Sequence, residues 1–372
     1  MILTTIRRPL IDALRRVASV GAQSATVRFD GTTASASGFC EGVFASAPFE
    51  TGRENGSASV VVPRVAVSFL SEANDSTVEI DVDDTGCDAV FRCGTSRLRT
   101  TAPKVAEFAR PAVATRTVAF ASETLKRVVR ALAPIAKSGD DPRYALRTIC
   151  FDSTEPGRLS FVATNGRVLA AETFATPSDF SAERRAIPAE KIARIVAALD
   201  DAATVEVGFV DGFVTFATPT FWASAPSVVG DYPPWRRVVE AAGGPKTARV
   251  EKAELANAVR LAKITTDKKR RIRLLFDLTG FTASAVGAEI GSSVVCGAAT
   301  DVFETLAFDV DSESFAFLER FGETGTVEIA FAERKPIRIA EVATKADGVS
   351  GAVAVVMPMG PEEKRESKGK RR

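Results

Sequence analysis

Histidine is absent from the 372 residues of the chain. Ser-His-Asp and Cys-His catalytic couples and histidine-ligated metal sites are therefore excluded. The phosphate-binding patterns GxxxxGK[ST] and GxGxxG are also missing, and GGPKT at 243–247 matches only part of the first. Mechanisms that use carboxylates alone or a Ser-Lys pair remain open, but no spacing of these residues indicates one. We therefore expect a protein that is not an enzyme and that uses no cofactor or metal.

Cysteine is scarce, and long apolar runs are missing. The five cysteines are odd in number and form no CxxC pair, so neither a disulfide framework nor a zinc site is indicated. Two arginines at positions 7 and 8 interrupt the N-terminal segment before a signal sequence can form, and no run of about 20 apolar residues follows. We expect a cytoplasmic protein with reduced thiols and no membrane span.

The residues that are present indicate a globular protein built from an internal repeat. Hydrophobic residues make up 45% of the chain and charged residues 26%, as in soluble domains, and the length suits two or three of them. The tripeptide TVE followed by Ile or Val begins at Thr77, Thr204 and Thr326. Each copy follows an apolar helical stretch that ends in small or acidic residues, and each precedes alternating, strand-like segments. A repeated setting of this kind predicts three copies of one structural unit.

Each unit also has a helical pattern in its first half. Apolar residues recur on one face of 7–19, 122–136 and 252–264. Connectors with proline or glycine at 102–112 and 240–248 separate the units. The predicted fold class is α+β, with three repeated domains at 1–115, 116–246 and 247–360, each with two amphipathic helices packed on antiparallel sheet.

Basic residues gather on these helices although the chain as a whole is nearly neutral, with 48 basic and 47 acidic residues. Arg15, Arg16, Lys126, Arg130, Lys137, Lys191, Arg194 and Lys263 lie opposite or beside the apolar stripes. Such a face suits a protein that meets phosphate on one side only. Taken alone, the pattern is explained better by cations that keep exposed helix faces soluble.

Apart from Met1, the chain has two methionines, Met357 and Met359, both in the segment VVMPMG. Burial at the edge of a core is the more common fate of such residues. Methionine is also a flexible, polarizable side chain found where a surface must fit another chain. The residues themselves leave both interpretations open.

Four segments, the first of them the stretch 140–172, resemble one family in the correct order. RYALRT and VATNGRVLA, within 140–172, resemble the RYxLxG and VATDGHRLA-like stretches of the bacterial β sliding clamp, the processivity subunit of the replicative DNA polymerase. RRAIPAEKIARIVAAL, YPPWRRVV and VVMPM resemble later segments of the same family. Single motifs are weak, since an Asn-Gly pair is first of all typical of a type I′ hairpin. Their occurrence in the family's order, in a chain of three repeated units, is a strong signal, and the resemblance covers residues 1–360.

The resemblance implies a ring of three DNA-clamp domains per chain, closed as a head-to-tail homodimer. The basic helix faces would then point at duplex DNA in the central hole, without reading its sequence. The DNA-facing residues are expected to be Arg15, Arg16, Lys126, Arg130, Lys137, Arg143, Tyr144, Lys191, Arg194 and Lys263. The last domain and the first would meet across the dimer interface through Leu98, Thr100 and Ile264.

The resemblance also implies a hydrophobic pocket that receives short peptides from the replicative polymerase, the clamp loader and other partners. Carried over by position, it comprises Leu146, Thr164, Gly166, Arg167, Val168, Leu169, Pro233, Arg237, Val238, Val355, Met357, Pro358 and Met359. Flexible methionine walls would let one site fit different peptides.

Several residues depart from the family pattern. Arg167-Val168 stands in place of a histidine-arginine pair, so the peptide preference is expected to differ. Asp140 occupies a position that is often a polar DNA contact, and the set of Leu98, Thr100, Lys263 and Ile264 is less apolar than usual. The twelve residues 361–372 extend past the usual end, carry six basic and three acidic residues, and are expected to be a disordered tail. A clamp-derived peptide-binding or inhibitory protein that closes no ring is the alternative function.

Overall fold

The computed structural model describes residues 1–85, 87–101, 112–137, 144–180, 182–201, 203–228, 230–268, 270–287, 290–333, 335–342 and 350–360. The chain divides into two compact units. Unit 1 comprises Met1–Val129, Thr148–Leu159 and Thr176–Gly230, and unit 2 comprises Arg130–Arg147, Ser160–Ala175 and the chain from Asp231 onward. This division passes through the second predicted repeat, so the domain boundaries after residues 115 and 246 stay predictions. Residues 102–111 of the first predicted linker and the predicted tail 361–372 lie outside the described residues.

The order of elements repeats three times along the chain. The first copy contains β1 (Ile2–Ile6), α1 (Arg7–Ser19), β2 (Ser24–Cys40), β3 (Val43–Pro63), α2 (Arg64–Glu72), β4 (Thr77–Val82), β5 (Asp88–Cys93) and β6 (Ser96–Thr101). The second contains β7 (Thr117–Ala121), α3 (Ser122–Lys137), η1 (Tyr144–Arg147), β8 (Thr148–Asp152), β9 (Arg158–Thr164), β10 (Val168–Ala175), β11 (Arg184–Pro188), α4 (Ala189–Ala197), β12 (Thr204–Val210), β13 (Phe213–Thr218) and β14 (Phe221–Pro226).

The third copy follows the connecting helix α5 (Trp235–Ala241). It contains β15 (Lys246–Glu251), α6 (Lys252–Lys263), β16 (Arg271–Asp277), β17 (Gly280–Gly287), β18 (Gly291–Gly297), β19 (Ala299–Thr300), β20 (Leu306–Asp311), the 3-10 segments η2 (Ser312–Phe315) and η3 (Leu318–Arg320), β21 (Thr326–Phe331), β22 (Ile337–Glu341) and β23 (Gly351–Val356). The three TVE segments begin β4, β12 and β21. The threefold repeat and the α+β class are confirmed.

Antiparallel sheets form the body of unit 1. Their strand orders are β1-β4-β5-β6 and β2-β3-β14-β13-β12-β7, and β11 pairs with β8. Helix α1 packs on β2 and β3 and buries Leu10, Leu14 and Val17, which recur at helical spacing. No side chain caps the start of this helix, but the N–H of Arg7 donates to the carbonyl oxygen of Ser76 at 2.8 Å. The apolar stripe of α1 therefore faces the sheet and leaves its basic face outward.

Unit 2 contains two antiparallel sheets. One follows the order β9-β10-β23-β22-β21-β15-β19, and the other follows β18-β17-β16-β20. Helix α6 packs on β17 and β18 and buries Leu255, Val259 and Ala262. The second sheet thus has one face on α6, while residues of β16 and β20 that alternate with the buried ones point to the other face.

The sequence predicts a second α-helix in the third domain, and this prediction is wrong. Its place is taken by η2 and η3, two short 3-10 segments. The side chain of Asp311 caps η2 by accepting from the N–H of Glu313 at 3.0 Å. Phe317 and Phe321 then pack edge to face, with ring centroids 5.1 Å apart, and Gly322 turns the chain away at a φ of +66°. Aromatic packing and a glycine shortly after it favour separate turns over one continuous helix.

Candidate functional site

The turn that joins β9 to β10 is held by Asn165. Its Oδ1 accepts hydrogen bonds from the N–H groups of Arg167 and Val168, at 2.9 and 2.8 Å. Gly166 has a φ of +85°, which favours glycine. The φ of Asn165 is not positive, so the expected type I′ turn is wrong, because that turn needs positive φ at both central residues. An asparagine side chain closes the turn instead, and it leaves Gly166 and Arg167 exposed at the tip.

The C-terminal segment runs from this turn to the second sheet of unit 2. Strand β23 pairs with β10, and beyond the paired strands the N–H of Met357 donates to the carbonyl oxygen of Arg167 at 2.9 Å. The N–H of Met359 donates to the carbonyl oxygen of Asp309, in β20, at 2.7 Å. The backbone of both methionines is therefore fixed. The side chain of Met357 is 47% exposed, and Pro358 and Met359 are half-buried.

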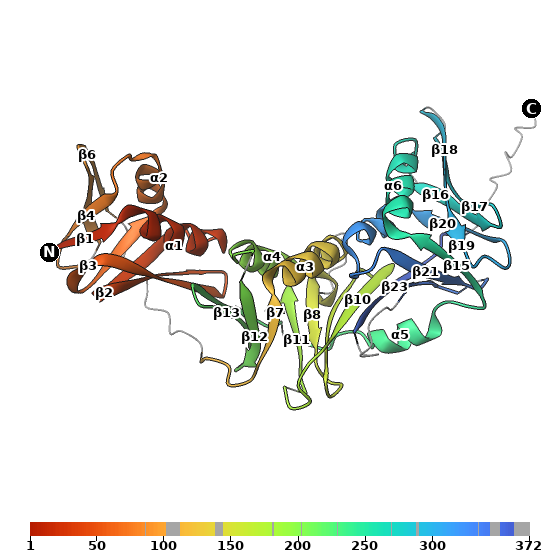
Figure 1. Ribbon diagram of the computed structural model, residues 1–372, viewed down its shortest axis with the longest axis horizontal. Coiled ribbons are helices and arrows are strands. Elements are labelled where there is room, and N and C mark those ends of the chain that lie inside the picture. Colours follow the sequence, from red (N-terminus) through yellow and green to blue (C-terminus); the bar gives the residue numbers. More distant parts are fainter. Residues whose placement is uncertain are drawn as a thin grey trace, which may run out of the picture. The chain divides into compact units, whose positions relative to one another are not determined.

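Helix α5 contacts β23, and the loop before it is anchored by Tyr232 (Figure 1). The hydroxyl of Tyr232 donates to the carbonyl oxygen of Val162 at 3.1 Å, and the ring is buried. Trp235 is buried in the first turn of α5, whereas Arg237 and Val238 are exposed, Val238 at 38%. Sequence reasoning missed Tyr232, whose place in YPPWRRVV was its only signal. It positions α5 beside the strands.

Three segments far apart in the sequence therefore meet around β23 in unit 2. On these segments lie Thr164, Gly166, Arg167, Val168, Leu169, Pro233, Arg237, Val238, Val355, Met357, Pro358 and Met359 of the predicted pocket. Leu146, in η1 of the same unit, is also buried, and its place in the pocket stays a prediction. Leu169 and Val355 are buried beneath, so the accessible apolar side chains are those of Met357 and Val238. We call this set, without Leu146, the Met357 surface.

Three predicted DNA-facing cations of unit 1 are tied to acidic residues. Nη2 of Arg16, on α1, lies 2.6 Å from Oδ1 of Asp200. On α4, Nη1 of Arg194 lies 3.5 Å from Oε2 of Glu41, and Nζ of Lys191 donates to the carbonyl oxygen of Glu41. The two ion pairs reduce the positive charge of Arg16 and Arg194, whereas the bond of Lys191 to a backbone carbonyl leaves its charge in place.

Arg15 keeps its charge on the surface of α1. It is exposed and donates to Oγ of Ser71 at 3.1 Å. Together with Arg16 it lines an open hollow of about 450 Å³ between α1 and the end of α4. The hollow also contains Asp12 and Asp200, so its charge is mixed.

Lys126 does not face solvent, and its predicted DNA-facing role has no support. Its side chain is 10% exposed, Nζ lies 2.6 Å from Oδ1 of Asp201, and it donates to the carbonyl oxygen of Leu199 at 2.5 Å. A buried ammonium must be paired, and both partners come from the end of the segment that follows α4. Lys126 therefore ties α3 to that segment.

Of the other predicted DNA contacts, Arg130 and Lys263 have side chains that the structure describes. Arg130 is exposed on α3, and Lys263 at the end of α6 lies 2.6 Å from Oε1 of Glu313. The side chains of Lys137 and Tyr144 lie outside the described part of the chain, and so does all of Arg143. Arg15 and Arg130 are thus the described predicted contacts that are exposed and for which no ion pair is named above.

The predicted dimer residues lie at or near sheet edges of the two units. Strand β6 is the last in the order β1-β4-β5-β6, and it carries Leu98 and Thr100, both half-buried. Strand β18 is the first in its own sheet and exposes Val294, and Ile264 is exposed just after α6. Unpaired strand edges with apolar side chains are surfaces on which another chain can add a strand.

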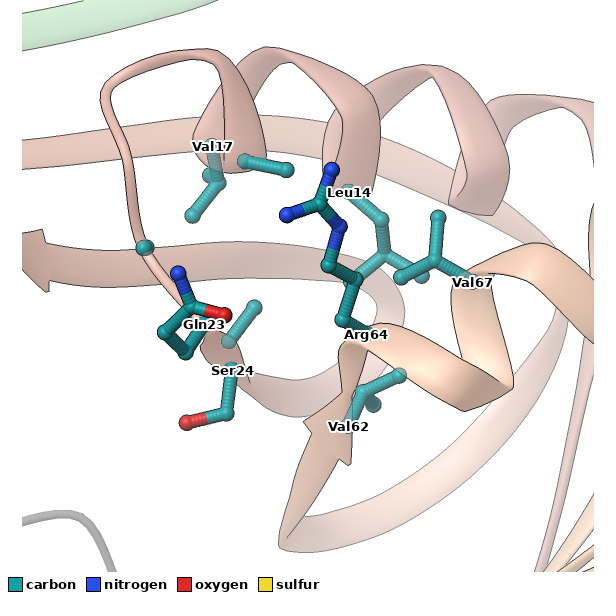
Figure 2. A pocket seen from close by; sticks show the side chains of 10 residues that line it. Leu14, Val17, Gln23, Ser24, Val62, Arg64 and Val67 are labelled. Atoms are coloured by element: carbon teal, nitrogen blue, oxygen red, sulfur yellow. The ribbon is translucent and has the colours of Figure 1, made fainter.

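A small cavity in unit 1 is unsuited to a ligand (Figure 2). Figure 2 labels Leu14, Val17, Gln23, Ser24, Val62, Arg64 and Val67 around it. Its volume of about 10 Å³ is at most that of one water molecule. No small-molecule site is indicated there.

Three carboxyl groups have pKa values below their usual range, and each lies in a turn. The N–H of Thr77 holds down the pKa of Asp75, and the hydroxyls of Thr85 and Thr279 hold down those of Asp83 and Asp277. Hydrogen bonds to the charged form explain these shifts. The three are separate from one another in the sequence and stabilise local turns. Among the described residues, no group of acidic or cysteine side chains could hold a metal ion.

The comparisons with known proteins place the fold. No family model and no curated protein matches the sequence. Solved structures match over 97% of this chain and 100% of theirs: the DNA polymerase III subunit beta from Pseudomonas aeruginosa, with a TM-score of 0.83 and 20% identity, and the DNA polymerase sliding clamp from Bacillus subtilis, with 0.85 and 17%. The beta subunit from Thermotoga maritima matches with a TM-score of 0.79 and 16% identity over the same shares. Within the described residues, no helix is long and apolar enough to cross a membrane.

Proposed function

We propose, for a chain that has the fold of the bacterial DNA polymerase III β sliding clamps, that it is a divergent sliding clamp. It would act as a non-enzymatic processivity factor in the cytoplasm, encircling duplex DNA and tethering the replicative polymerase and other partners. The observation that carries the proposal is the Met357 surface, because three distant segments converge there and leave apolar side chains accessible. A fold alone can serve many functions, so the site must support the assignment.

Peptide binding at the Met357 surface is energetically reasonable. Fully burying a Leu or Phe side chain of a ligand contributes about 1.5–3 kcal/mol. Two or three such anchors approach the roughly 8 kcal/mol of a micromolar complex. Weak binding of this order suits a surface that several partners use in turn. The partners we propose are the replicative polymerase, the clamp loader and other proteins with short clamp-binding peptides.

A small number of exposed cations suits a protein that slides on DNA. Arg15 and Arg130 remain exposed, whereas Arg16, Arg194 and Lys263 are paired with acidic residues. Each phosphate contact adds about 0.9 to the slope of log affinity against log salt, so a few contacts give weak binding that is independent of sequence. A closed ring would hold DNA by topology and would not need strong contacts.

Ring closure requires a second copy of the chain. The edge strands β6 and β18, with Leu98, Thr100 and Ile264 near them, support a head-to-tail homodimer. A dimer would have twice the chain mass of 39.4 kDa. Sedimentation equilibrium at micromolar concentration tests this directly, and a monomer there would count heavily against a ring.

A clamp-derived peptide-binding or inhibitory protein is the second candidate function. The ion pairs on α1, α4 and α6 favour it, because they neutralise cations that would otherwise meet DNA. A processivity assay distinguishes the two candidates: a clamp lengthens the products of its polymerase, whereas an inhibitor competes for partner peptides and shortens them.

A further inference from the structure

Four arginines of unit 2 gather beside the C-terminal segment 357–360. They are Arg167 in the β9–β10 turn, Arg270 just before β16, and Arg271 and Arg273 in β16. Nη2 of Arg271 donates to the carbonyl oxygen of Gly360 at 3.0 Å, and the carbonyl oxygen of Arg167 accepts from Met357. The four arginines, which we call the arginine rim, therefore border the Met357 surface.

Two of these arginines are committed to two aspartates of β20. Asp309 and Asp311 lie two residues apart and thus on the same face of the strand, opposite β16. Nη1 of Arg271 lies 2.5 Å from Oδ2 of Asp309, and Nη2 of Arg270 lies 3.0 Å from Oδ2 of Asp311. Both carboxylates are therefore neutralised.

Arg270 is held in an uncommon backbone conformation. Its φ is +52°, which is unfavourable for a residue with a Cβ unless its surroundings fix it. The N–H of Ser312 donates to its carbonyl oxygen at 2.8 Å, and the pair with Asp311 fixes its side chain. The fold therefore holds Arg270 and Arg271, the two paired arginines of the rim, in fixed positions.

The other two arginines carry positive charge that these aspartates do not balance. Nη1 of Arg167 lies 3.8 Å from Oδ2 of Asp311, and Nη1 of Arg273 lies 3.6 Å from Oδ1 of Asp309, both beyond hydrogen-bonding distance. Their side chains are 74% and 61% exposed. The four arginines and two aspartates therefore leave two positive charges in excess, on the side chains that solvent reaches most easily.

We propose that the arginine rim selects partner peptides in which acidic residues flank the apolar anchors. The inference rests on the proposed function, because it assigns the flank of a peptide whose anchors sit on the Met357 surface. A peptide on Met357 lies beside Arg167, and one that continues along segment 357–360 passes Asp309, which pairs with Arg273 in the sheet, before it reaches Arg271 at Gly360. A guanidinium matches a carboxylate with two parallel hydrogen bonds, and exposed charges of this kind contribute mainly to specificity and association rate.

The test compares two labelled synthetic peptides with the same Leu and Phe anchors. One is flanked on both sides by Glu and the other by Gln, and binding to the full chain is measured by fluorescence polarization at 50 and 300 mM NaCl. At the lower salt we expect the Glu-flanked peptide to bind about 3- to 10-fold more tightly, from one or two exposed ion pairs. Salt should reduce the preference, because the Debye length falls from roughly 13 Å to about 6 Å between these concentrations.

Variants assign the preference to the rim. Arg167→Gln with Arg273→Gln should abolish it. Arg273→Gln alone should reduce it and leave the Gln-flanked affinity unchanged, because Arg273 lies outside the Met357 surface. Arg167→Lys combined with Arg273→Lys should retain most of the preference for the Glu-flanked peptide, since both positive charges remain. Arg260→Gln, which removes an exposed arginine of α6 in the same unit, should leave the preference intact. A melting curve for each variant shows whether it is folded.

Three results would overturn the proposal in distinguishable ways. Equal binding of both peptides would refute the role of the rim and leave the proposed peptide surface standing. Binding of neither peptide would remove the proposed function and the rim with it. A Glu preference that persists unchanged in the variant with Arg167→Gln and Arg273→Gln would assign the selection to residues outside the rim.

Discussion

Replacing Met357 by alanine removes the most accessible apolar side chain of the Met357 surface. Burying a whole methionine contributes about 1.5–3 kcal/mol. Since 47% of this residue is exposed before a ligand binds, a peptide that covers it gains about 0.7–1.4 kcal/mol. The dissociation constant should therefore rise about 3- to 10-fold, because 1.4 kcal/mol corresponds to a factor of ten.

The fold should survive this substitution. The hydrogen bond to Arg167 uses the backbone N–H of Met357, which alanine keeps, so the loss of unfolding free energy should stay below about 1 kcal/mol. Fluorescence polarization with a peptide carrying Leu and Phe anchors measures the affinity, and calorimetry measures the melting temperature. Leu278→Ala, at an exposed leucine in the β16–β17 turn of the same unit, is the matched control and should bind normally. An unchanged dissociation constant for Met357→Ala, with a peptide that binds the wild type, would refute the assignment of this surface.

Three further predictions concern other parts of the chain. Tyr232→Phe removes the hydrogen bond to Val162 and should lower the unfolding free energy by about 0.5–1.5 kcal/mol in urea titrations. Peptide affinity should also fall, because α5 is less firmly placed. An unchanged stability would show that Tyr232 does not anchor α5. Lys126→Met breaks two charge-assisted hydrogen bonds, to Asp201 and to a backbone carbonyl, and should lower the free energy of unfolding by about 1.5–3 kcal/mol. DNA binding, measured well below the melting temperature, should not change. A selective loss of DNA binding would show that Lys126 contacts DNA. Arg15→Gln should weaken DNA binding and reduce the slope of log affinity against log salt by about 0.9; an unchanged slope would show that Arg15 does not contact phosphate.

The repeat was accessible to sequence reasoning because its signals are local. Each TVE segment begins a strand, and the three predicted helices that start the domains appear as α1, α3 and α6. Their apolar residues recur at helical spacing and pack on the neighbouring sheet, so the burial pattern is encoded in short stretches. Strand and helix periods alone were sufficient for the fold class.

Features that depend on distant partners were not accessible. Lys126 looked like any exposed helix lysine, and its partner Asp201 lies 75 residues away. Neither the register of β16 against β20, which places Arg271 opposite Asp311, nor the hydrogen bond of Tyr232 has a local signal. The predicted type I′ turn failed for a related reason, since the side chain of Asn165 closes the turn in another way.

The pocket residues came from family resemblance and not from physical periodicity. The structure brings β10, β23 and α5 together, and the role of Leu146, which is buried in η1, stays a prediction. It adds what resemblance did not supply, namely the exposure of Met357 and Val238 and the anchoring of α5. Whether peptides bind there is a question for the affinity measurements above.

The central claim is that the protein encircles DNA, and retention on a circular template tests it most directly. The protein is loaded by a clamp loader on nicked circular DNA, free protein is removed by gel filtration, and half of the sample is linearised with a restriction enzyme. A topological link predicts that the protein stays on the circle and is lost from the linear form. Equal retention on both forms, or no retention on either, would contradict the account.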